Sequence, residues 1–128
     1  MKPYEKLVAK GAALLDKHKP DWWNGKTKPT IDLATLDLSN TCNCVLGQVY
    51  RPPRTQRRAL FAGLREPTGY DLGRQALGIE VGHGHGFDVR IRHDIARRKR
   101  QHGILGQRWL ELIRRRRRAA ARKARRDG

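Results

Sequence analysis

The sequence has few aromatic residues, few acids, only two cysteines and no long apolar run. Phe, Trp and Tyr make up 6% of the 128 residues, and the base-stacking pattern of RNA-recognition domains is missing. Two cysteines, Cys42 and Cys44, are too few for a disulfide framework, so a reducing compartment is expected. No stretch of about 18 apolar residues occurs, so we expect no membrane span. The opening MKPYEKLVAK carries charges where a secretory signal needs apolar residues, which favours a cytoplasmic protein.

The shortage of acids leaves a large positive charge at one end of the chain. Lys and Arg number 29 against 12 Asp and Glu, a net charge of +17. Residues 1–50 hold seven Lys, no Arg and five acids, whereas residues 90–128 hold fourteen Arg, two Lys and three acids. Guanidinium groups bind phosphate through two parallel hydrogen bonds, so an Arg-rich segment favours a polyanionic partner.

Periodicity predicts a mainly α protein, a small single-domain helical bundle with at most a short strand pair. One modest core is expected, since 38% of the residues are hydrophobic. Segment 31–38 is either a short strand or an extended lead into the next helix. Helices are predicted over 4–18, 42–50, about 56–64, 69–77, about 89–101, and from 105 into the Arg-rich end.

Local signals suggest where these helices begin and end. Ser39, Asn40 and Thr41 are candidate N-caps for the helix over 42–50. Thr68 is a candidate N-cap for the helix over 69–77, and Gly78 suits its C-terminal end. Gly103 is expected to close the helix over 89–101.

The predicted compact domain covers residues 1–113, followed by a basic extension over 114–128 that is either a helix or a tail. Because like charges four residues apart repel, this extension is expected to be disordered until it binds a partner. Only one of Trp22 and Trp23 is expected to point inward. The predicted core consists of Leu7, Leu15, Val45, Leu46, Val49, Leu60, Phe61, Phe87 and Trp109.

Several short motifs recur in the order of a known group of proteins. They are GAALLD at 11–16, LDLSNTCNCVLGQVY at 36–50, GHGFD at 84–88 and GQRWLELIRR at 106–115. In this combination the chain resembles small actinobacterial and actinobacteriophage proteins. The resemblance implies a shared fold and a phage-related origin, hence a location in the host cytoplasm, but no activity. The chain departs from that pattern in RPPRTQRRALFAGLREP and in the Arg-rich end.

The Arg-rich end is the main candidate site. If Arg114–Arg118 are helical they sweep more than a full turn, since each residue advances by about 100°. No single flat groove can then take all five, whereas a phosphate lattice can. A second basic patch is expected at Arg51, Arg54, Arg57 and Arg58. The predicted nucleic-acid-binding residues are Arg97, Arg98, Lys99, Arg100, Arg114, Arg115, Arg116, Arg117, Arg118, Arg122, Lys123, Arg125 and Arg126.

Two other sites have weaker support in the sequence. Cys42 and Cys44, with His83, His85, His93 and His102 downstream, have the residue types of a zinc site, but C-x-C is shorter than the usual spacing. A buried Cys44 and surface histidines are the simpler interpretation. The close grouping of His83, His85, Asp88, His93 and Asp94 resembles the components of a metal-dependent nuclease without a complete motif. Asp88 and Asp94 also suit a helix cap and an ion-pair partner of Arg97 or Arg98.

The sequence therefore predicts a small, non-enzymatic, phage-derived protein that binds DNA or RNA through backbone phosphates with little sequence preference. No metal and no cofactor are expected. The first alternative is a host-directed protein-interaction module whose basic tail binds an acidic partner. The second is a metal-dependent nuclease or hydrolase that uses His83, His85 and Asp88.

Overall fold

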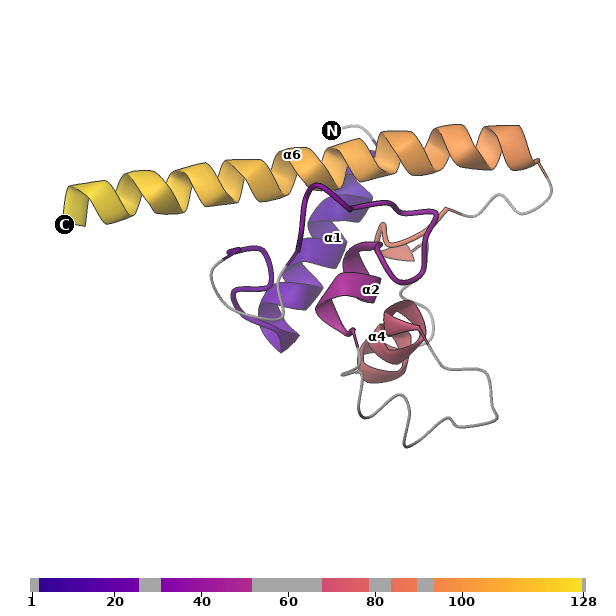
Figure 1. Cartoon of the computed structure of the whole chain (residues 1–128), viewed down its shortest axis with the longest axis horizontal. Coiled ribbons are helices and arrows are strands. Elements are labelled where there is room, and N and C mark those ends of the chain that lie inside the picture. Colours follow the sequence, from indigo (N-terminus) through magenta and orange to yellow (C-terminus); the bar gives the residue numbers. More distant parts are fainter. Residues whose placement is uncertain (1–2, 26–30, 52–67, 79–83, 90–93, 128) are drawn as a thin grey trace.

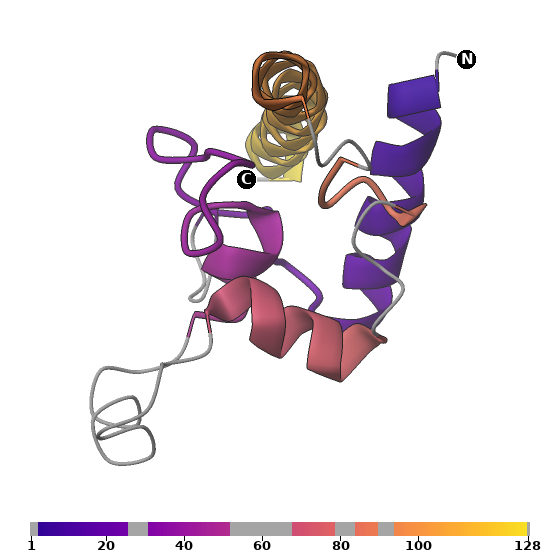
Figure 2. The same ribbon diagram turned by 90° about the vertical axis from the view of Figure 1, so that its right-hand side faces the viewer.

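The computed structural model describes residues 3–25, 31–51, 68–78, 84–89 and 94–127, and these ranges are mainly helical. Four helices are described: α1 (Pro3–His18), α2 (Val45–Val49), α4 (Gly69–Leu77) and α6 (Ile95–Asp127). The long helix α6 lies across one side of the molecule, with α1, α2 and α4 beneath it (Figure 1). Viewed along α6, α1 lies on one side and α2 on the other, and α4 crosses beneath them (Figure 2). The predicted helical bundle is confirmed, and the described ranges contain no strand.

Helix α1 forms where the sequence predicts it. Val8, Ala12 and Leu15 follow helical spacing and are buried, so they form the face that packs against the rest of the core. Glu5 lies in the first turn and Lys17 and His18 in the last, which suits the helix dipole.

Helix α6 is longer than predicted. Asp94 caps its start by accepting a hydrogen bond from the main-chain N–H of Arg97 at 3.0 Å. Gly103 does not end a helix, as the sequence suggested, because buried His102 and Leu105 on either side of it belong to one continuous packed face. A Gly inside a helix lowers its stability by only about 1 kcal/mol relative to Ala. Burial of the His102 and Leu105 side chains outweighs this loss.

Helix α2 is shorter than predicted and begins at a different residue. Its N-cap is Cys44, whose Sγ accepts from the Gly47 N–H at 3.3 Å, and not Ser39, Asn40 or Thr41. The Asn40 side chain instead accepts from the N–H groups of Cys42 and Asn43. These bonds stabilise a turn before α2. A short polar side chain such as that of Asn40 binds main-chain N–H groups and so competes with helix formation.

Segment 31–38 does not form the short strand that was one of its two predicted forms; its main chain at Asp32 pairs with a side chain instead. Buried Gln48 accepts from the Asp32 N–H at 2.6 Å and donates to the carbonyl oxygens of Asp32 and Asn43. Its amide thereby ties the loop to α2.

Trp109 of α6 lies at the centre of the core. Its ring stacks on Phe87 at 5.3 Å and meets the Trp22 ring edge-on at 5.7 Å, and its Nε1–H donates to the Gly86 carbonyl oxygen at 2.6 Å. Trp22 is buried and Trp23 only partly, as expected of the pair. Of the predicted core, Leu7 is only half-buried, Leu60 and Phe61 lie outside the described residues, and the six others are buried: Leu15, Val45, Leu46, Val49, Phe87 and Trp109.

Helices α2 and α4 meet through glycine. Thr68 caps the start of α4 and Gly78 follows its end, as predicted, and Asp71 completes a capping box with Thr68. A Cβ built on Gly69 would collide with the Gly47 carbonyl of α2, so only glycine allows this approach.

We therefore expect Gly69→Ala to destabilise the protein by about 1–3 kcal/mol, since overpacking shifts the backbone. The matched control is Gly103→Ala. Nothing lies within 4 Å of a Cβ at Gly103, so this change should stabilise α6 by about 1 kcal/mol. Urea unfolding of both variants provides the measurement, and shifts of the same sign would contradict the proposed contact.

Candidate nucleic-acid interface

All thirteen predicted contact residues lie on α6, in two groups. Arg97, Arg98, Lys99 and Arg100 are exposed in its first turns, and the other nine occupy the segment after Ile113. The boundary predicted between Ile113 and Arg114 falls inside a continuous helix. Within the described residues the extension is helical to Asp127, not the disordered tail expected from charge repulsion.

The run Arg114–Arg118 divides between two sides of the helix. Leu105, Trp109 and Ile113 are buried, so they define the inner face of α6. Arg116 follows Trp109 by seven residues, close to two turns, and therefore continues this face. Arg116 and Arg117 are half-buried, whereas Arg114, Arg115 and Arg118 are exposed.

Arg116 holds α6 against α1. Its two terminal nitrogens donate to the two carboxylate oxygens of Asp16 at 2.6 and 3.0 Å, and its guanidinium lies 5.7 Å from the centre of the Trp22 ring. Trp22 also donates its Nε1–H to Asp16. Burial raises the pKa of the Asp16 carboxyl, but hydrogen bonds from Arg116 and Trp22 and the charge of Arg116 lower it below 3.8.

Arg117 holds the loops beside α1. Its Nε donates to the Trp23 carbonyl oxygen at 2.7 Å, and a terminal nitrogen donates to the Ile31 carbonyl oxygen at 2.5 Å. Burial lowers the pKa of this guanidinium, and the negative charge of Asp32 partly offsets the effect. We call Arg116 and Arg117 the arginine clamp, because their guanidinium groups donate hydrogen bonds to other parts of the protein and hold α6 against them.

The sequence contains a signal for one residue of the clamp, Arg116. Counting from the Trp109 stripe at about 100° per residue already places Arg116 inward. The identity of its acceptor, Asp16, depends on how α1 crosses α6, which sequence spacing does not give.

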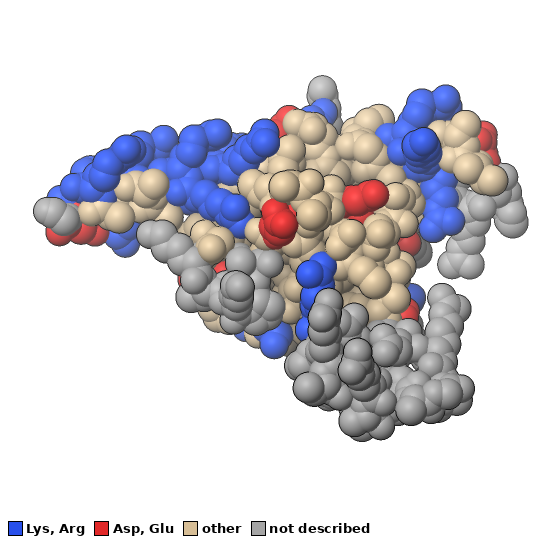
Figure 3. All heavy atoms as spheres, viewed as in Figure 1, with Lys and Arg blue, Asp and Glu red and all other residues tan. Residues whose placement is uncertain are grey.

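Beyond the clamp, α6 projects from the body of the protein (Figure 1). Residues 118–127 add about 15 Å of helix at 1.5 Å per residue. All of them are exposed except Ala120, which is half-buried. Asp127 is the only acid in this segment, and Lys and Arg cover much of the projecting end seen in Figure 3. No described acceptor pairs with its five basic side chains: Arg118, Arg122, Lys123, Arg125 and Arg126.

In the middle of α6, positive and negative side chains come closer to equal numbers. Arg108 lies between two carboxylates, with Nε 3.9 Å from Glu5 and a terminal nitrogen 3.4 Å from Glu111. These residues line a groove between α1 and α6. The unpaired positive charge of the helix is therefore concentrated at its two ends.

The second predicted basic patch is described only at Arg51. Its guanidinium donates to the Cys42 carbonyl oxygen and to the Asn43 side chain, so it stabilises the turn before α2. Arg54, Arg57 and Arg58 lie outside the described residues.

The described candidates for a metal or catalytic site do not gather into one metal-binding group. Cys42 is exposed and Cys44 is buried, where burial raises the pKa of its thiol to about 12. His85 is half-buried, and His83 and His93 lie outside the described residues. No group of three His, Cys, Asp or Glu side chains suited to a metal occurs among the described residues.

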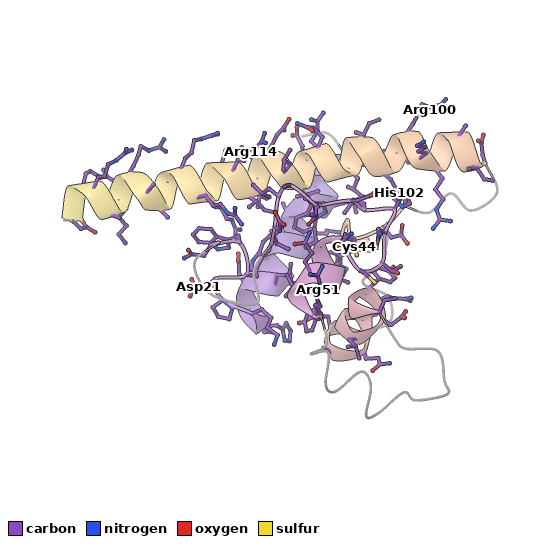
Figure 4. All side chains as sticks on the ribbon, in the orientation of Figure 1. Asp21, Cys44, Arg51, Arg100, His102 and Arg114 are labelled. Atoms are coloured by element: carbon purple, nitrogen blue, oxygen red, sulfur yellow. The ribbon has the colours of Figure 1, made fainter. Side chains whose placement is uncertain are left out.

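The pair formed by Asp88 and His102 was not predicted. His102 is buried, and its Nε2 lies 2.7 Å from the Asp88 carboxylate, which also lies 3.4 Å from the Tyr70 hydroxyl (Figure 4 labels His102). Asp88 thus links α6, α4 and segment 84–89 and does not cap a helix. Asp94 interacts with the main chain of Arg97 as a cap, in place of the ion pair expected from sequence.

The Asp16–Arg116 pair predicts a pH-dependent contribution to stability. Because the folded-state pKa of Asp16 is lowered, the contribution is present above the ordinary carboxyl pKa and is lost as the pH falls through the lowered value. Asp16 is partly exposed, and solvent screening limits the expected loss in Asp16→Asn to about 1 kcal/mol at pH 7.

Thermal unfolding of the parent protein and Asp16→Asn from pH 7 down to pH 3 checks this expectation. The difference between the two should narrow below about pH 4. Asp127→Asn, at the exposed far end of α6, is the control and should match the parent protein throughout. A difference for Asp16→Asn that does not depend on pH would contradict the role given to its charge.

None of the described helices is both long enough and apolar enough to cross a bilayer. Neither the protein-family models, nor the curated proteins, nor the solved structures include a match to this chain.

Proposed function

We propose that this protein binds nucleic acid without catalysis, through contacts between α6 and backbone phosphates. One observation carries the proposal: the projecting end of α6 holds five basic side chains that pair with no described acceptor. Four of the five are Arg, whose planar guanidinium suits phosphate. Both the DNA and RNA backbones offer this chemistry, with little dependence on sequence. The resemblance to actinobacteriophage proteins supports a phage origin.

The arginine clamp supports this function indirectly. It fixes the direction in which the helix leaves the body, so the projecting charges are presented on a rigid support. A helix that is already ordered avoids part of the entropic cost that a disordered tail meets on binding.

The alternative of a protein-interaction module needs a contiguous apolar surface. Ile95 and Ile104 are the large apolar side chains that are well exposed in the described ranges. They are nine residues apart, which places them on opposite sides of α6. Their separation favours the nucleic-acid proposal.

A salt titration tests the proposed function. Fluorescence anisotropy with labelled duplex DNA, single-stranded DNA and structured RNA should give affinities that fall steeply with salt. If seven exposed Arg and Lys after Ile113 contact phosphates, the slope of log K against log salt is about −6 on duplex DNA. Poly-glutamate of equal charge is the control for a general acidic partner. Negligible binding to all three nucleic acids near 0.15 M salt, or equal binding to poly-glutamate, would overturn the proposal.

A further inference from the structure

The side of α6 that faces away from the body carries a straight row of arginines. At about 100° per residue, these side chains lie within about 60° of the direction opposite Trp109. All are exposed, and Figure 4 shows Arg100 and Arg114 on the side of α6 that points away from α1 and α2. We call this row the outer track; it consists of Arg97, Arg100, Arg114, Arg115, Arg118, Arg122 and Arg125.

The outer track has positive charge at both ends and none in its middle. Between Arg100 and Arg114 the same face presents Ile104, Gln107 and Glu111, all exposed. This gap is about 21 Å long at 1.5 Å per residue. A surface selected only for solubility has no reason to arrange its charge in this way.

The dimensions of the track match a double helix. From Arg97 to Arg125 it spans about 42 Å, or about 12 base pairs at 3.4 Å each. The centres of its two charged parts lie about 30 Å apart, near the 34–36 Å of one turn of B-DNA. We propose that the outer track lies along a single DNA duplex and contacts phosphates at two places about one helical turn apart. This inference rests on the proposed function and specifies its partner.

The interruption in the track favours a duplex over a single strand. Along one side of a double helix, the phosphate chains alternate with grooves, so a straight rod meets phosphate only at intervals. The uncharged and acidic middle of the track would then face the major groove, the wider of the two grooves in one turn, and the longer charged part would begin at the phosphate chain on the far side of that groove. A flexible single strand follows any line of charge, and an interrupted row gives it no advantage.

Two double variants with equal loss of charge test the inference. Arg97→Gln with Arg100→Gln removes the first part of the outer track. Arg98→Gln with Lys99→Gln removes the same charge from the same turns but from other sides of the helix. On a 16-base-pair duplex at 0.1 M salt, the first variant should bind about 10- to 60-fold more weakly than the second, the upper limit corresponding to two lost phosphate contacts.

Duplex length provides the second arm of the experiment. An 8-base-pair duplex, about 27 Å long, cannot reach both charged parts fully, so the difference between the two variants should disappear on it. Equal affinities of the variants on the long duplex, or an equal difference on both lengths, would overturn the inference. A larger difference on duplex RNA than on DNA would overturn the choice of B-form DNA.

Two remaining outcomes are also informative. Co-capture of two differently labelled 16-base-pair duplexes by one chain would show that the ends of α6 bridge separate molecules, which also contradicts the inference. If the parent protein binds no nucleic acid, the proposed function itself is wrong. If it binds nucleic acid but the two variants behave alike, only the alignment of the outer track along a duplex is wrong. Circular dichroism of both variants checks that α6 remains helical.

Discussion

Replacing Arg115, Arg118, Arg122 and Arg125 together with Gln is expected to weaken binding to duplex DNA by about 10²–10³-fold at 0.1 M salt. Each phosphate contact adds about 0.9 to the slope of log K against log salt, so four lost contacts should reduce its magnitude by about 3.6. Anisotropy titrations at several salt concentrations measure both quantities. Because glutamine is a good helix former, the variant should lose charge while α6 remains helical.

The matching control replaces the same four residues with Lys. Charge is retained while paired hydrogen bonding is lost, so the salt slope should be kept and the affinity should fall by less than in the Gln variant. A Gln variant with unchanged affinity would place the phosphate contacts elsewhere on the chain. Loss of binding in both variants to the same extent would indicate that guanidinium geometry, and not charge, dominates.

Trp109→Ala is expected to cost about 3–5 kcal/mol, the range for truncating a fully buried large aromatic residue. The change removes the contacts with Phe87 and Trp22 and leaves the Gly86 carbonyl without its donor. Small domains are stable by about 5–15 kcal/mol, so the variant should lose most of its resistance to urea. Unfolding followed by far-ultraviolet circular dichroism measures the loss.

Trp23→Ala is the control for this prediction. Trp23 is adjacent to a buried tryptophan but is itself only partly buried, and its known bond to Arg117 uses the main-chain carbonyl, which the substitution retains. Its cost should be less than half that of Trp109→Ala. Equal costs would show that the core is not centred on Trp109.

The parts of the fold that sequence predicted are those set by neighbouring residues. Thr68 and Gly78 enclose nine residues, and each acts within one or two turns of its position, so α4 was predicted with its correct bounds. The helix predicted over 4–18 rests on equally local spacing. Neither prediction needs any knowledge of which surface the helix meets.

The parts that sequence missed depend on partners distant in the chain. Gly103 has the local character of a helix end, yet packing of His102 and Leu105 keeps the helix continuous. His102 meets Asp88 across 14 positions, and Arg116 meets Asp16 across 100. In the Arg-rich segment the composition gave the candidate contact residues, but only tertiary packing distinguishes the outward arginines from the clamp.

The clamp also decides where the chain can be shortened. By composition alone, a truncation after Ile113 separates a folded domain from a basic appendage, but it would delete Arg116 and Arg117 along with the projecting charges. Such a fragment would lose its bonds to Asp16, Trp23 and Ile31, and weak binding by it would mix damage to the body with loss of the interface. A deletion that removes the projecting charges and spares the clamp must begin at Arg118. The last residues that stabilise the body therefore lie inside the segment that composition alone marks as a tail.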